Sequence, residues 1–254
     1  MMNITVIGAG NSGLAMAAHL GLNGHRVILW NRSRSNIAKL IETKQIYSHG
    51  AIKGRVEIDL VTDDIGLAVA DPDIIFITTP ANSHKGLAEL IGRNIRKECL
   101  IVLNPGRTFG ALEFQEVYSK YNKEFDQVIA ETQTIIYTCR KTSEDSVKVI
   151  SLKNNVLIST FDGNDNRDIL ARLPQCIQEY FIPARSMIET SIGNVGMILH
   201  CAPLLLNVGW TENKKHIYKH YYEGITPSVG AFIEKIDNER IEVSKILGLE
   251  VEIG

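Results

Sequence analysis

The sequence predicts an α/β fold in which a parallel sheet is covered by helices on both faces and is followed by a second, smaller all-helical domain. Short apolar segments typical of buried strands alternate with helical segments in the first half of the chain, which is the pattern of such a sheet. A glycine-rich turn lies between the first strand and the first helix. From Ser191 onward, apolar residues recur at helical spacing, which predicts helices alone.

The individual elements follow from the same pattern. In the first half we predict strands at residues 4–7, 27–30, 58–61, 74–78 and 100–103, and helices at 14–22, 35–44, 65–70 and 85–95. After about residue 125 we predict strands at 128–131, 135–140, 147–152 and 156–160, then helices at 167–180, 192–208 and 226–247. The change of pattern near residues 187–191 predicts one domain of residues 1–188 and another of residues 189–254.

Composition limits the classes of protein to which the chain can belong. Of its 254 residues, 44% are hydrophobic and 22% are charged, which is typical of a globular chain and excludes disorder as the main state. The net charge of −2 leaves no basic excess for binding nucleic acid. The longest apolar run, residues 195–206, is shorter than the ~20 residues that span a bilayer.

Two further features concern the cellular compartment. The first strand begins near Asn3, which leaves no room for a signal peptide. The four cysteines lie far apart and form no CxxC pair. We therefore expect a cytoplasmic protein with free thiols, which binds neither a membrane nor nucleic acid.

The turn after the first strand has the GxGxxG spacing of a dinucleotide-binding loop. Gly8 permits the tight turn, Gly10 lets a pyrophosphate approach the backbone, and Gly13 lets the helix pack closely on the strand. Asn11 and Ser12 lie at the start of that helix, whose free N–H groups attract phosphate. Because the loop opens a β-α-β unit, we predict a Rossmann-type, doubly wound, dinucleotide-binding domain; a glycine-rich turn without a ligand is the alternative.

The end of the second strand indicates which dinucleotide binds. NAD sites usually carry Asp or Glu there, whereas this chain has Asn31 and Ser33 beside two guanidinium groups. Arg32 and Arg34 would attract a 2′-phosphate, and Lys39 lies one helical turn further on. We therefore predict NADP(H), with NAD as the alternative cofactor. If these basic residues only form a solvated turn, they say nothing about the 2′ position of the cofactor.

Two later loops also follow the carboxyl ends of strands, so they are expected to line the same crevice. The first contains Thr79 and Pro80 and is placed near the nicotinamide ribose, and the second begins at Asn104. His84 is interpreted as a residue at the start of a helix.

The predicted helix at residues 192–208 is apolar nearly all round, so we expect it to be buried, with Asn194, His200 and Asn207 as polar exceptions. Pro203 is expected to kink this helix just past His200 and to free a backbone carbonyl near Leu199. Hydride transfer to C=O or C=N needs a proton donor, and imidazole titrates in the suitable range. His200 is therefore the candidate catalyst, and a hydrogen-bonded core histidine is the alternative.

His216 and His220 have a spacing that can hold a metal on a helix. No third ligand is evident, and several lysines surround the pair. We interpret this segment as a solvated basic face and predict no metal.

Several segments together resemble the opine dehydrogenases, the octopine/nopaline dehydrogenase family. The segments are AETQT at 130–134, YTCR at 137–140, 193–209 from GN through HCAP to LNVG, and 221–240 from YYEG through TPS to DNER. The resemblance implies a Rossmann domain plus a helical domain. It also implies reductive condensation of an α-keto acid with an amino acid, in which a nicotinamide delivers hydride to an imine.

The resemblance also implies roles for individual residues. His200 matches the proton-relay histidine, which in this family is assisted by a carboxylate, and Glu131 and Asp237 are the candidates here. Arg140 and Tyr222 are candidates for binding a substrate carboxylate, a structural ion pair being the alternative for Arg140. Asn194 and Asn207 complete the predicted substrate-binding set.

This chain is shorter than is usual for opine dehydrogenases, many of which carry the acidic partner in a further C-terminal part. Two other functions stay open, the first because its family shares the two-domain plan and the second because the chain is short. One is a 2-keto acid reductase resembling ketopantoate reductase, although residues 191–196 lack the lysine of that family. The other is an NADP(H)-binding protein without turnover. Aromatic residues of the short helical domain, such as Trp210 and Phe232, also suggest a homodimer.

Overall fold

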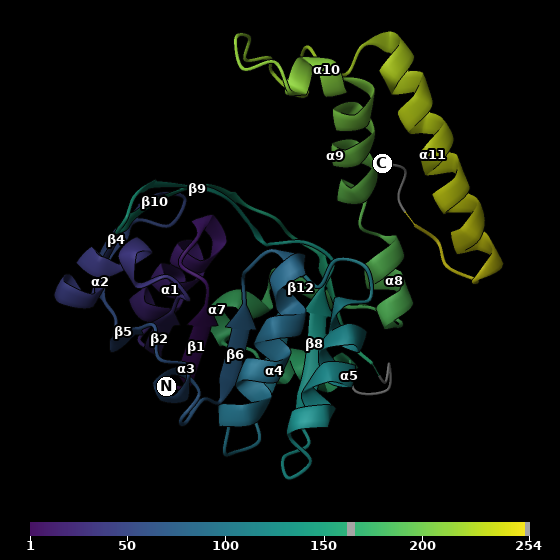
Figure 1. Cartoon of the computed structure of the whole chain (residues 1–254). Coiled ribbons are helices and arrows are strands. Elements are labelled where there is room, and N and C mark those ends of the chain that lie inside the picture. The colour runs from purple at the N-terminus through teal and green to yellow at the C-terminus, as the bar shows by residue number, and fades with distance from the viewer. Residues whose placement is uncertain (162–165, 252–254) are drawn as a thin grey trace. The chain divides into compact units, whose positions relative to one another are not determined.

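The computed structural model describes residues 1–161 and 166–251 of the chain. The chain divides into two compact units, Met1–Ser191 and Ile192–Gly254. Figure 1 shows the course of the chain through both. Each unit is described by itself.

Within the described residues, the first unit is built on an 8-stranded sheet of order β12-β11-β8-β7-β6-β1-β2-β5. Its strands are β1 (Asn3–Ile7), β2 (Arg26–Trp30), β5 (Leu60–Thr62), β6 (Ile74–Ile77), β7 (Leu100–Leu103), β8 (Val128–Thr132), β11 (Val156–Thr160) and β12 (Phe181–Pro183). The six neighbouring strands β5, β2, β1, β6, β7 and β8 are parallel to one another. Strand β11 is antiparallel to β8, and β12 is parallel to β11. The predicted α/β fold is confirmed, with two reversed strands at one edge.

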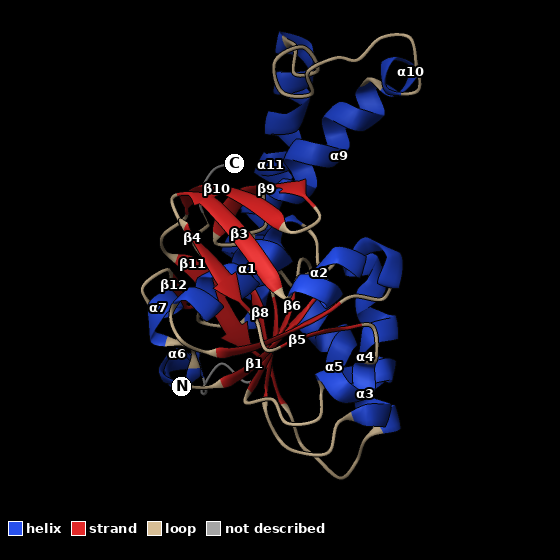
Figure 2. Cartoon of the chain, turned by 90° about the vertical axis from the view of Figure 1, so that its left-hand side faces the viewer, coloured by secondary structure: helices blue, strands red, loops and turns tan. Residues whose placement is uncertain are grey.

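Helices cover both faces of this sheet (Figure 2). One face packs against α1 (Asn11–Leu22), α6 (Asn166–Arg172) and α7 (Gln175–Gln178), and the other against α3 (Ile65–Ala68), α4 (His84–Asn94) and α5 (Gly110–Tyr121). The 3-10 turn Arg34–Asn36 and α2 (Ala38–Thr43) follow β2. The central strands β6 and β7 are fully buried, as the unbroken apolar runs of a doubly covered parallel sheet require.

A second, 4-stranded sheet lies on the outer side of α1. Its order is β4 (Gly54–Glu57), β3 (Gln45–Gly50), β10 (Ser146–Leu152) and β9 (Tyr137–Ser143). The sequence predicted β9 and β10 but missed β3 and β4, because these two strands are short and expose polar side chains along much of their length. Helix α1 is therefore enclosed between two sheets, and residues 12–20 are all buried.

Helices are the only regular secondary structure among the described residues of the second unit. Helix α8 (Met187–Ile192) ends where this unit begins, and α9 (Gly196–Leu206), α10 (Val208–Thr211) and α11 (Pro227–Ile246) follow. Helix α11 starts where the Thr226 hydroxyl accepts a hydrogen bond from the Val229 N–H. The hydrophobic core of the second unit is small and consists of Ile198, Ala202, Val229 and Ile233. In the described residues, no helix is both long enough and apolar enough to cross a membrane.

Two predictions about the helix at 192–208 are wrong. The helix is interrupted at Gly193 and Asn194, whose low helix propensity permits a break between α8 and α9. Helix α9 is also not buried all round, because Leu204, Leu205 and Leu206 are 42%, 73% and 49% exposed. The small helical core covers only one side of it.

The first prediction concerns the contact between α1 and the glycine turn. A Cβ on Gly13 would overlap the carbonyl oxygen of Gly8, so Gly13→Ala should lower the free energy of unfolding by about 1–3 kcal/mol despite the better helix propensity of alanine. A Cβ on Gly10 meets nothing within 4 Å. Gly10→Ala is therefore the matched control, and urea denaturation should find it unchanged within about 0.5 kcal/mol. Equal stability of the two variants would contradict this packing.

Candidate functional site

The loops that carry most candidate residues follow the parallel strands at their carboxyl ends. The glycine turn follows β1, residues 31–36 follow β2, residues 78–83 follow β6, and residues 104–109 follow β7. Because parallel neighbours end at the same edge of a sheet, these loops gather at one side of the first unit.

The glycine turn is shaped to receive a phosphate group. Gly8 has φ +108°, which side chains rarely allow, and a Cβ there would lie 2.8 Å from the Cγ2 of Thr79. Gly10 faces open space. Helix α1 begins there without a side-chain cap and without an acidic residue in its first turn. Its first N–H groups are thus free for an anion, and the turn fits the diphosphate of a dinucleotide.

Polar side chains hold this turn in place. The Oδ1 of Asn31 accepts from the Ala9 N–H at 3.2 Å, which ties the end of β2 to the turn. The Oδ1 of Asn11 accepts from the Lys141 N–H at 2.7 Å, and the Ser12 hydroxyl donates to the Thr78 carbonyl at 3.3 Å. Three predicted cofactor residues therefore meet at the turn.

Two pockets adjoin the turn and share Asn31 and Asn36. One, of about 520 Å³, is lined by Trp30, Asn31, Arg32, Ser33, Asn36, Thr79, Pro80, Asn82, Ser83, Gly86, Leu87 and Leu90. The other, of about 500 Å³, is lined by Ala9, Gly10, Asn31, Ser35, Asn36, Lys141 and Glu144. Both have volumes typical of small-molecule sites, and together they run from the glycine turn past the end of β2.

The basic residues predicted for a 2′-phosphate differ in their surroundings. Arg34 forms an ion pair with Asp63 at 2.8 Å, and Lys39 forms one with Asp145 at 2.7 Å, which raises the pKa of Lys39. Arg32 is exposed and makes no side-chain hydrogen bond or ion pair within residues 1–161 and 166–251. Of the three cations, it is the one whose charge is not already paired.

Sequence reasoning missed Lys141. This residue lies on β9 of the second sheet, and its Nζ donates to the Ala9 carbonyl at 3.1 Å, beside Gly10 in the smaller pocket. The contact joins residues 132 positions apart, so no local pattern could have indicated it.

The later loops contribute two buried polar residues. His84 is 1% exposed, its Nε2 lies 3.2 Å from the Thr79 carbonyl, and burial lowers its pKa. Asn104 is fully buried, and its Oδ1 accepts from the Thr132 hydroxyl at 2.9 Å. In the described part of the chain, the Nδ1 of His84 and the Nδ2 of Asn104 have no hydrogen-bond partner. His84 begins α4, which agrees with its interpretation as a helix-start residue.

Glu131 lies at the end of β8 and is fully buried. Its Oε1 accepts from the hydroxyls of Thr190 at 2.6 Å and Ser191 at 3.1 Å, and its Oε2 accepts from the Ala111 N–H at 3.0 Å. Burial raises the pKa of Glu131, although these hydrogen bonds oppose the rise. The carboxylate joins β8, α5 and α8.

His200 lies on α9 with its side chain exposed, so it is not a sealed core histidine. Its Nδ1 is 3.0 Å from the hydroxyl of Tyr221, and its ring lies 6.2 Å from that of His220. The Nε2 of His220 lies 3.3 Å from the carbonyl of Leu199. No group of three or more metal-ligating side chains occurs among the residues described.

The other candidates of the helical unit are divided between buried and exposed positions. Asp237 is paired with Arg240 at 2.7 Å, and both side chains are buried. Asn207 donates to the carbonyls of Pro203 and Gly224, so its side chain has a structural role in linking two backbone segments. Asn194 is buried, whereas Tyr222 is 88% exposed. In the first unit, Arg140 is exposed and donates to the Cys139 carbonyl.

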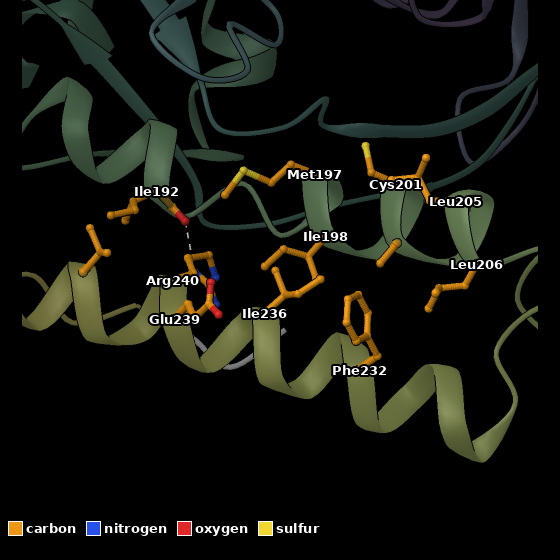
Figure 3. Close-up of a pocket in the computed structure, with 12 residues that line it drawn as sticks. Ile192, Met197, Ile198, Cys201, Leu205, Leu206, Phe232, Ile236, Glu239 and Arg240 are labelled. Carbon is orange, nitrogen blue, oxygen red and sulfur yellow. Dashed lines mark hydrogen bonds between the residues drawn. The ribbon is translucent and has the colours of Figure 1, made fainter.

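An apolar groove of about 710 Å³ runs between α9 and α11 (Figure 3). The groove is lined by residues of both helices, including Met197, Ile198, Cys201, Leu205, Phe232, Ile236 and Val243. At one end Arg240 donates to the Ile192 carbonyl at 3.0 Å.

Comparison with known proteins identifies both parts of the chain. Residues 183–253 match the family described as NAD/NADP octopine/nopaline dehydrogenase, alpha-helical domain. Residues 3–108 match the NAD-dependent glycerol-3-phosphate dehydrogenase N-terminus. An opine dehydrogenase of Arthrobacter sp. (strain 1C) is 36% identical over 247 residues, which cover 97% of this chain and 68% of the relative.

Solved structures show the same fold. An octopine dehydrogenase in complex with NADH and agmatine superposes with a TM-score of 0.74 at 16% identity, over 96% of this chain and 64% of that one. An NADP+-bound yersinopine dehydrogenase gives 0.78 at 17% identity, over 99% and 66%. The chain thus spans about two thirds of the length of these proteins. With its 36% identity to the Arthrobacter enzyme along nearly its whole length, the chain belongs to the opine dehydrogenase family.

Proposed function

We propose that this protein is an NADP-dependent opine-type dehydrogenase that joins an α-keto acid to an amino acid. The observation that carries the proposal is the extent of the 36% identity to an opine dehydrogenase, which covers 97% of the chain. The glycine turn of the first unit and the exposed His200 of the second both belong to that chain.

The proposed reaction has three steps. The amine nitrogen attacks the keto carbon and gives a carbinolamine. Loss of the hydroxyl as water forms the C=N bond, and His200 supplies the proton that the departing hydroxyl needs. The nitrogen keeps its proton in this step, so the C=N group is an iminium. When bound, a nicotinamide would supply the hydride that its carbon accepts, which gives a secondary amine that carries both carboxylates. The described residues supply the diphosphate cradle at Gly10 and the proton donor at His200.

NADP(H) is the cofactor that we propose over NAD. No carboxylate ends β2, and the exposed Arg32 lies beside Ser33 in the larger pocket. Arg34 and Lys39 contribute less to a 2′-phosphate because Asp63 and Asp145 already pair with them. Each proposed substrate carries a carboxylate, and Arg140 and Tyr222 are the exposed groups that we propose for binding it.

Glu131 and Asp237 are poor candidates for the proton-relay partner. Three donors already occupy the Glu131 carboxylate, and Arg240 pairs with Asp237 in the helical core. We propose that both carboxylates have structural roles. Glu131 links β8, α5 and α8, and Asp237 stabilises the helical unit.

The alternative functions are less well supported. A 2-keto acid reductase would need no amine, and the lysine that supports such an assignment is missing from residues 191–196. A binding protein without turnover would use only the diphosphate site at the glycine turn and would have no catalytic residue. The homodimer and the cytoplasmic location stay predictions.

The reaction is tested by NADPH oxidation with pyruvate or 2-oxoglutarate and a panel of amino acids. Oxidation should require keto acid and amine together. His200→Gln should lower kcat by about 100-fold or more, because a positioned proton donor typically contributes that much. His216→Gln, an exposed histidine of the same unit, should leave kcat unchanged. Keto-acid reduction without amine would support the reductase, and tight NADPH binding without turnover would support the binding protein.

The cofactor preference is tested at Arg32. Arg32→Ala should weaken NADPH binding by about tenfold, because one charge-assisted contact at an exposed site contributes about 1–2 kcal/mol. NADH binding should change little. Arg34→Ala is the control, and fluorescence titration should show a smaller loss because Asp63 already pairs with Arg34. An equal loss for NADH and NADPH would argue against a 2′-phosphate contact.

Because Glu131 has a structural role, we expect its substitution to lower the stability of the fold more than the rate of the reaction. In Glu131→Gln an amide nitrogen replaces an acceptor, so a buried donor loses its partner and the free energy of unfolding should fall by about 1–3 kcal/mol. The folded fraction should keep kcat within about tenfold. Glu113→Gln, an exposed change on α5, is the control for chemical denaturation. A 100-fold loss of kcat at unchanged stability would instead assign Glu131 to proton transfer.

A further inference from the structure

Pro203, which lies inside α9, leaves one backbone carbonyl without its helical partner. Pro203 has no N–H, so the carbonyl of Leu199 cannot receive the usual hydrogen bond from four residues further along. The Nε2 of His220 lies 3.3 Å from this carbonyl oxygen. Because a carbonyl only accepts, His220 must donate through an Nε2–H group. The carbonyl freed by Pro203 thus fixes the position and the tautomer of His220.

The neighbouring residues form a second contact across the same two segments. The hydroxyl of Tyr221 lies 3.0 Å from the Nδ1 of His200, which follows Leu199 on α9. The rings of His220 and Tyr221 meet edge to face at 4.8 Å between centroids, and the rings of Tyr221 and His200 are 6.0 Å apart. Two adjacent residues of α9 are therefore joined to two adjacent residues of the following loop.

The direction of the hydrogen bond between Tyr221 and His200 follows from their chemistry. A phenol has one proton to donate, whereas a neutral imidazole has one nitrogen that accepts strongly and one N–H. The phenol therefore donates to Nδ1, and the proton of the neutral His200 ring resides on Nε2. The hydrogen bond at one ring nitrogen determines which nitrogen carries the proton. Among the described residues, Nε2 of His200 has no hydrogen-bond partner, so its N–H is free to act.

We propose that Tyr221 is a positioning residue that holds His200 in the Nε2–H tautomer, and that His220, bound to the carbonyl freed by Pro203, keeps Tyr221 in place. The proposal rests on the proposed function in that His200 is the proton donor there. Within the described residues, the Nδ1 of His200 is bonded to this phenol and to no carboxylate. Tyr221 polarises and orients the ring without adding a buried charge.

The experiment combines ¹⁵N-histidine NMR with steady-state kinetics. The ¹⁵N signals of His200, assigned by their loss in His200→Gln, should show a protonated Nε2 and an accepting Nδ1 at alkaline pH, where imidazoles are neutral. Tyr221→Phe removes only the hydroxyl and should mix the two tautomers. It should lower kcat by about tenfold with less effect on KM. Tyr218→Phe removes a hydroxyl of the same loop that bonds to Thr211 instead of His200, and it is the matched control.

His220→Ala should shift the His200 signals in the same direction as Tyr221→Phe, whereas His216→Ala should not. Unchanged His200 tautomer signals in both Tyr221→Phe and His220→Ala would overturn the proposal, even if turnover fell. The NMR readout does not depend on turnover. A tautomer shift in a protein that turns over no keto acid and amine supports the pairing and contradicts only the proposed reaction.

Discussion

The close packing of α1 against the glycine turn is the constraint on which the first unit depends. A methyl group at Gly13 would occupy the position of the Gly8 carbonyl oxygen, so the helix can approach the end of β1 only with glycine there. Sheets on both sides of α1 then bury it along residues 12–20. This enclosure directs the free N–H groups of the helix start toward the crevice, where a diphosphate would bind.

The charges around that crevice are arranged by pairs that join distant segments. Asp63 and Asp145 each neutralise a cation that follows β2, and Asp145 lies in the turn between β9 and β10 of the second sheet. The same sheet brings Lys141 to the glycine turn. The second sheet therefore supports α1, and the turn between its strands β9 and β10 also pairs Lys39 beside the nucleotide pockets. A basic segment in a sequence indicates cations, but the folded neighbours decide how much of their charge a ligand meets.

The sequence predicted the parts of the fold that local pattern encodes. Apolar runs predicted the central strands, the glycine spacing predicted the turn, and Pro203 predicted that a backbone carbonyl near Leu199 would lose its helical partner. The short strands β3 and β4 were missed because they show little apolar alternation. The exposure of α9 was missed because an apolar helix has the same composition whether neighbours cover it or not. The pairing of Tyr221 with His200 depends on a loop that returns to the helix, which no spacing rule describes.

A crystal structure of the protein with NADPH and a keto acid tests the central claim most directly. The account predicts the diphosphate over Gly10 at the start of α1, the 2′-phosphate beside Arg32, and the Nε2 of His200 facing the substrate carbonyl at the nicotinamide C4. An imidazole turned away from the nicotinamide in the loaded protein, with the cofactor bound as predicted, would contradict the proposed chemistry.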